Sequence, residues 1–193
     1  MRVSRVEAEQ NRERIIEVAA RLFRERGFDG IGVADLMKSA GLTHGGFYGH
    51  FASKEDLMMQ ACARAQDDSL AALQRVAESA GKNGLSAVAS SYLTPAHRDR
   101  PGQGCVLAAL GAEAARQGSP VRGAFTRGVR SALDMLTRLV PGKSERARRK
   151  RALATYASMI GALVLARAVD DPELSEEVLQ SVLASITGTN TPA

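Results

Sequence analysis

The chain of 193 residues has no tryptophan, only two cysteines and few aromatic side chains, which make up 4% of it. Two cysteines cannot build a disulfide scaffold, and such a count is typical of a protein kept in a reducing compartment. The longest apolar run, 152–166, is interrupted by polar residues and is shorter than the roughly 20 residues that a membrane span requires. The first residues, MRVSRVEAEQNRER, lack the apolar core of a secretory signal peptide. We therefore expect a cytoplasmic globular protein with no membrane contact.

Catalytic and cofactor signatures are also missing. The three histidines, His44, His50 and His97, do not stand at metal-binding spacings from cysteines or carboxylates. No phosphate-binding glycine loop follows a predicted strand, and no nucleophile elbow of a serine hydrolase is present. The sequence therefore predicts no enzyme, no metal and no cofactor.

Positive charge exceeds negative charge in the whole chain but not in its first part. The formal net charge is +5 at pH 7, yet residues 1–56 hold nine basic and nine acidic side chains. The excess is densest in the run 143–151, KSERARRKR. Such a run is a second nucleic-acid contact, an entrance for an anionic ligand or, most often, the solvated start of a helix. Net charge alone therefore does not locate a site for a polyanion.

Apolar residues recur with the period of an α-helix through most of the chain. Ile15, Ala19 and Leu22 follow this pattern in a first helix that ends at Gly27. Further helices are predicted at 33–40, in a short segment that begins at Thr43, and from the cap Ser53 to the GKNG break at 81–84. Beyond this break, helices are predicted up to Leu93 and at about 105–117, 120–139, 145–169 and 173–187. Residues 94–104 are expected to form a loop, because prolines and glycines interrupt any period. No segment alternates like a strand, so the sequence predicts an all-α fold.

A helix of about eight residues, a turn at Gly41 and a second short helix make the arrangement of a helix-turn-helix motif. The second helix opens with residues 43–46, THGG, which offer a hydroxyl, an imidazole and backbone N–H groups. These groups suit phosphate oxygens and base edges in a major groove about 12 Å wide. Phe47 and Phe51 share one face and are expected to hold the helix on its support. The motif predicts binding to double-stranded DNA.

Residues 32–57, GVADLMKSAGLTHGGFYGHFASKEDL, resemble the DNA-binding signature of TetR-type transcriptional repressors, in one ungapped register. The resemblance implies a three-helix DNA-binding domain at 1–52, with the motif at about 32–51, and a larger helical domain at 53–193 that binds an effector and dimerises. It also implies a repressor that binds a palindromic operator as a homodimer and is released by a small-molecule or reactive inducer. By the resemblance, Thr43, Tyr48 and Lys54 fall on phosphate-contacting positions, and His44, Gly45 and Gly46 fall where the family reads bases. His50 is a further candidate, because its imidazole can donate a hydrogen bond to an oxygen of the DNA backbone.

Three glycines depart from the family pattern. Gly46 and Gly49 stand where larger side chains are common, and each costs roughly 1 kcal/mol in a helix interior, so we expect a loose second helix that orders on DNA. Gly32 replaces the usual Ser or Thr cap of the preceding helix. Tyr48 has an alternative role as a lid on the small core, and His50 as a structural hydrogen-bonding residue.

The two last predicted helices, at about 145–169 and 173–187, resemble the pair that forms the dimer interface in this family. Ala154, Ser158 and Ala162 recur every four residues on the first of them, and such small side chains permit close helix approach. The alternative is that both helices belong to the core of a monomer. Only a dimer places two recognition helices about 34 Å apart, so the predicted function requires the dimer.

The effector site is less defined by the sequence. Candidate residues for an apolar ligand pocket are Cys105, Leu107, Leu110, Phe125, Met135, Tyr156 and Met159, although such residues at helical spacing are more often plain core. Cys105 stands at the expected start of a helix near His97, a setting typical of a sensing cysteine, and its alternative role is that of a small buried apolar residue. Glu113 lies on an otherwise apolar helix and either binds a polar group or faces water. A helical protein-interaction adaptor without DNA binding remains the main alternative function.

Overall fold

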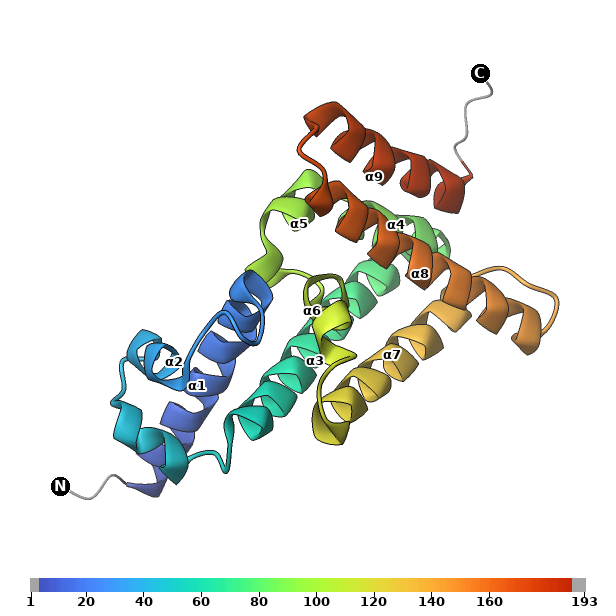
Figure 1. Cartoon of the computed structure of the whole chain (residues 1–193). Helices are drawn as coiled ribbons and strands as arrows, with labels where there is room; N and C mark the ends of the chain where they lie inside the picture. Colours follow the sequence, from blue (N-terminus) through green and yellow to red (C-terminus); the bar gives the residue numbers. More distant parts are fainter. Residues whose placement is uncertain (1–3, 189–193) are drawn as a thin grey trace. The chain divides into compact units, whose positions relative to one another are not determined.

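The computed structural model describes residues 4–188, and in this range the chain forms nine α-helices and three short 3-10 helices without any strand (Figure 1). The predicted all-α fold is confirmed. The elements are α1 (Arg5–Arg26), α2 (Val33–Ser39), η1 (His44–Gly49), α3 (Lys54–Ala80), η2 (Gly81–Asn83), α4 (Gly84–Tyr92), α5 (Pro95–Asp99), η3 (Pro101–Gln103), α6 (Val106–Ala114), α7 (Ser119–Leu139), α8 (Glu145–Ala168) and α9 (Pro172–Thr187).

These elements divide into two compact units. The first unit comprises residues 1–67 and 101–127, and the second comprises 68–100 and 128–193. The long helices α3 and α7 each contribute residues to both units. The functional boundary after residue 52 that the resemblance implies stays a prediction, since these units are defined by packing alone.

The first unit is organised around α1, whose ends are fixed by local hydrogen bonds. Ser4 caps the helix: its Oγ accepts a bond from the Glu7 N–H at 3.2 Å, and the Glu7 carboxylate accepts one from the Ser4 N–H at 2.7 Å. These bonds from Ser4 lower the pKa of Glu7 below its usual value. At the other end Gly27 adopts φ 78°, which ends the helix as the sequence predicts.

The core of this unit is apolar and aromatic. Phe23, Phe28 and Phe47 are fully buried, and the rings of Phe23 and Phe28 meet edge to face at 5.4 Å. Leu36 and Met37 of α2 are buried in the same cluster. The helix-turn-helix segment is therefore held to α1 by side chains that are removed from water.

The second unit contains α8 and α9, which pack along one another (Figure 1). Asp171 caps α9 by accepting bonds from the N–H groups of Glu173 and Leu174, and Pro172 occupies the first helical position. The buried Ser175 hydroxyl donates to the Ala166 carbonyl at 2.7 Å and so ties the two helices together. In the described part of the chain, no helix is long and apolar enough to cross a membrane.

Two local predictions are wrong. Residues 94–104 are not a plain loop but form α5 and η3. Thr94 accepts a bond from the His97 N–H at 3.1 Å, and Pro95 stands at the first position of α5, so this proline starts a helix rather than interrupting one. The segment that follows Thr43 is a 3-10 helix, and the Thr43 side chain makes no capping bond to it.

Candidate nucleic-acid interface

The turn between α2 and η1 is set by Gly41. Its φ of 72° lies in the left-handed region, and the Leu42 N–H returns to the Met37 carbonyl over 2.9 Å. The end of α2 is thereby closed, and the chain leaves at an angle that starts η1 three residues later. This is the geometry of a short helix pair joined by a glycine turn.

The short helix η1 is anchored by one aromatic side chain and presents its remaining surface outward. Phe47 is fully buried and its ring lies 5.6 Å from that of Phe51, which is itself 2% exposed. The inward orientation predicted for both rings is confirmed. The ring of Tyr48 meets the Phe47 ring edge to face at 5.2 Å, yet 71% of Tyr48 is exposed. Tyr48 therefore does not close the core but lies on its outer side.

The other predicted DNA-contacting residues lie on the same stretch with graded exposure. Thr43, His44 and Gly45 are exposed, and Gly46 and His50 are half-buried. Nothing lies within 4 Å of the position that a side chain at Gly45 or Gly49 would occupy, so the backbone is open to a close approach there. The structure brings all of these residues together around one exposed turn, and their contact with DNA stays a prediction.

Lys54, the first residue of α3, already makes a hydrogen bond within the chain. Its Nζ donates a hydrogen bond of 2.6 Å to the backbone carbonyl of Phe28, in the loop after α1. The preceding Ser53 caps α3 as predicted, because its Oγ accepts from the Asp56 N–H at 3.1 Å. An ammonium group carries three donors, so a bond to Phe28 is compatible with a second one to a phosphate oxygen.

Sequence reasoning missed Arg12, which supports the segment from the side of α1. Its guanidinium lies 5.4 Å from the centroid of the Phe51 ring and donates to the side-chain carbonyl of Gln60 on α3. Gln60 in turn donates to Asp56 at 2.7 Å. No local pattern indicates these contacts, because Arg12 and Gln60 are separated by 48 positions.

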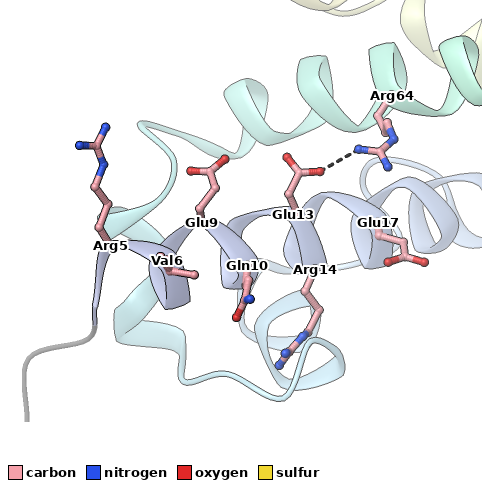
Figure 2. A pocket seen from close by; sticks show the side chains of 8 residues that line it. All are labelled: Arg5, Val6, Glu9, Gln10, Glu13, Arg14, Glu17 and Arg64. Atoms are coloured by element: carbon pink, nitrogen blue, oxygen red, sulfur yellow. Dashed lines mark hydrogen bonds and ion pairs between the residues drawn. The ribbon is translucent and has the colours of Figure 1, made fainter.

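A groove of about 680 Å³ runs along the exposed face of α1. It is lined by Arg5, Val6, Glu9, Gln10, Glu13, Arg14, Glu17 and, from α3, Arg64. Figure 2 shows Arg64 turned toward Glu13, to which it makes a 2.7 Å ion pair. Charged side chains of both signs line this groove, and none of the residues that the sequence predicts for the effector pocket is among them.

The residues predicted to line an effector pocket divide between the two units. Leu110 and Phe125 belong to the core of the first unit, Leu107 packs against it, and Cys105 is partly exposed. In the second unit Met135 and Met159 are buried and Tyr156 is half-buried. Their role as ligand contacts stays a prediction.

The two cysteines have different surroundings, and neither is in a disulfide. Cys62 is 2% exposed, and this burial raises its thiol pKa to about 12, against a smaller opposite effect of the Arg24 charge. Cys105 is the N-cap residue of α6 and is accessible to solvent. Over residues 4–188, no group of three histidine, cysteine or acidic side chains is placed to hold a metal ion.

Comparison with known proteins agrees with this geometry. Residues 15–61 match the model of the family described as "Bacterial regulatory proteins, tetR family". The chain is 37% identical over 59 residues to the HTH-type transcriptional regulator AcrR of Shigella flexneri (31% of this chain, 27% of AcrR). It is 36% identical over 98 residues to the HTH-type transcriptional repressor AcnR of Corynebacterium diphtheriae (51% of this chain, 47% of AcnR). The matched part thus spans less than half the length of these relatives.

Similarity to a solved structure extends over the whole fold. The reduced form of Escherichia coli NemR superimposes with a TM-score of 0.79 at 24% identity, over 93% of this chain and 96% of that one. At this identity the likeness describes the fold alone. It shows that the two-part helical architecture, and not only the first three helices, is shared.

Proposed function

We propose that this chain, a member of the tetR family of bacterial regulatory proteins by its residues 15–61, is a DNA-binding transcriptional regulator that acts as a repressor. One observation carries the proposal. A short helix, η1, is fixed by the buried Phe47 and exposes a turn of polar and glycine residues. A helix of this size fits into a major groove.

In the proposed complex, η1 enters the groove. His44 and the backbone at Gly45 and Gly46 read base edges, while Thr43, Tyr48 and Lys54 contact phosphates. His50, half-buried beside Phe51, is also assigned a contact with the phosphate backbone of the DNA. The DNA-binding domain is then residues 1–52, and residues 53–193 carry the dimer interface and the effector site.

The proposed homodimer forms through α8 and α9. Leu153, Val164 and Leu165 of α8 are 49%, 42% and 57% exposed, and Leu174 of α9 is 42% exposed. Apolar side chains of this size gathered on two adjacent helices are typical of a surface that a partner covers. Within the predicted small-residue stripe, Ala154 and Ser158 are exposed and available to a second copy, whereas Ala162 and Ala166 are buried.

The proposed release of DNA uses a small-molecule effector, and Cys105 is a second candidate trigger. Its partial exposure at the N-cap of α6 favours a reactive role over the alternative of a buried apolar residue. Alkylation by iodoacetamide tests this: Cys105 should react and Cys62 should not. Wild-type protein should lose affinity for DNA on treatment, and the Cys105→Ser variant should not; equal loss in both would contradict the sensing role.

The function itself is tested by selection of bound duplexes from a random pool with wild-type protein. A regulator of this kind recovers a palindrome whose half-sites are about one helical turn, or a multiple of it, apart. Replacement of His44 by alanine is expected to change the recovered sequence, and replacement of Lys54 to weaken binding to all sequences alike. The alternative, a protein-interaction adaptor, predicts no enriched sequence at all.

A family of regulators implies no enzyme, and the expected cytoplasmic location follows from a role on DNA.

A further inference from the structure

Both backbone polar groups of Phe28 are bound by charged side chains from other helices. Its N–H donates to the carboxylate of Glu113 on α6 over 2.7 Å, and its carbonyl accepts from Nζ of Lys54 on α3 over 2.6 Å. Its ring is fully buried against Phe23. The loop between α1 and α2 is thus fixed at one residue by three different helices.

Glu113 is the one charged residue of α6, whose sequence is VLAALGAEA. Its carboxylate lies so close to Gly27 that a Cβ added there would come within 2.7 Å of Oε1. Glycine at position 27 therefore allows both the positive φ that ends α1 and the approach of this carboxylate. A charged group on an apolar, half-buried helix face is costly unless it is hydrogen-bonded, and here its partner is the Phe28 N–H.

The opposite end of α6 is tied to the last turn of α1. Arg24 donates to the carbonyl of Gly104 over 2.8 Å, and Gly104 directly precedes Cys105, the N-cap of α6. The last turn of α1 and the loop that follows it are thereby held to the two ends of α6. A displacement of α6 must break these bonds or move the loop that leads into α2.

We propose that Glu113 is a positioning residue through which α6 sets the placement of the helix-turn-helix segment, 33–49. This inference rests on the proposed function and names a residue outside the helix-turn-helix segment on which that function depends. While Glu113 accepts the hydrogen bond of the Phe28 N–H, and Lys54 donates to the Phe28 carbonyl, the loop that leads into α2 stays in place. The position of η1, which follows α2, is thereby kept. Loss of this carboxylate leaves the Phe28 N–H without its acceptor and loosens η1.

Amide hydrogen exchange of the protein without DNA tests the placement directly. Glu113→Ala is expected to speed exchange of the Phe28 amide and of residues 44–49 by about tenfold, because local opening no longer breaks the Glu113 bond. Exchange in the buried turn of α3 around Leu57 should not change, which distinguishes loosening of this segment from loss of the whole fold. Glu113→Gln keeps an acceptor oxygen and should restore slow exchange. Glu17→Ala, which removes the same charge from the exposed face of α1, is the matched control.

Binding to a duplex selected with the wild-type protein supplies the second measurement. We expect the Kd to rise about tenfold in Glu113→Ala and to stay within about threefold of wild type in Glu113→Gln and Glu17→Ala. The salt dependence of the Kd should not change in Glu113→Ala, since no phosphate contact is removed.

The outcomes separate the two proposals. Wild-type exchange at residues 44–49 in Glu113→Ala overturns the positioning role, whatever the DNA measurement gives. Faster exchange with an unchanged Kd overturns it as well. A wild-type protein that selects no duplex overturns the proposed function, while the exchange experiment still judges the placement by Glu113.

Discussion

The guanidinium of Arg12 lies 5.4 Å from the centroid of the Phe51 ring, and this contact joins α1 to the segment between η1 and α3. The same guanidinium donates to Gln60 of α3. Arg12 therefore links α1 to α3 and to the segment between η1 and α3, and we interpret it as a support of the DNA-binding unit rather than a surface charge.

Replacement of Arg12 by alanine tests this support. We expect the free energy of unfolding to fall by about 1 to 2 kcal/mol, since a cation–π contact and a side-chain hydrogen bond are lost together. Urea denaturation followed by circular dichroism measures the change. Arg14→Ala, which removes an exposed arginine from the same helix, should have a much smaller effect, and equal effects of the two variants would contradict the assigned role.

Gly41, which precedes η1, and Gly49, its last residue, are expected to respond in opposite directions when replaced by alanine. Gly41 has φ 72°, so Gly41→Ala should destabilise the protein by about 1 to 2 kcal/mol. Gly49 has no positive φ and no atom within 4 Å of an added Cβ, so Gly49→Ala should stabilise it by about 0.4 to 1 kcal/mol through a less flexible unfolded chain. Thermal melting of both variants measures the two changes in stability. A stabilising Gly41→Ala would contradict the left-handed turn.

Much of this architecture was accessible from the sequence because its signals are local. Gly27 and Gly41 end helices where their pattern predicts it, and the four-residue spacing of Phe47 and Phe51 places both rings inward. The 3-10 form of η1 and the missing Thr43 cap were not accessible, because no local sequence signal separates six residues of 3-10 helix from a short α-helix. Glu113 and Phe28 meet across 85 positions, and no periodicity predicts such a pair.

The buried Cys62 makes stability depend on pH in the alkaline range. Burial raises its thiol pKa from 9.0 to about 12, so between these values the folded state keeps a proton that the unfolded chain has lost. The free energy of unfolding therefore falls as pH rises above 9, by up to about 1.4 kcal/mol per pH unit from this group. Denaturation at about pH 8 and about pH 10.5 should show a steeper loss in wild type than in Cys62→Ala. Equal losses in both proteins would show that this thiol does not titrate as described.

The apolar surface of α8 gives a direct test of the dimer. Leu165 is 57% exposed, and Leu165→Glu places two carboxylates at the proposed interface, so the dimer dissociation constant should rise by about 100-fold or more. Sedimentation velocity over a range of concentrations measures it. Val6→Glu, at an apolar position on α1 that is 67% exposed, is the control and should leave assembly unchanged. A Leu165→Glu variant that still sediments as wild-type dimer would place the interface elsewhere.

Hydroxyl-radical footprinting of the wild-type protein on a selected duplex tests the central claim most directly. If η1 enters the groove once per subunit of a symmetric dimer, two equivalent protected patches should appear about 34 Å, or one helical turn, apart, and both should vanish as salt rises. Uniform cleavage along the duplex at low salt, with the protein folded and in excess, would contradict the account.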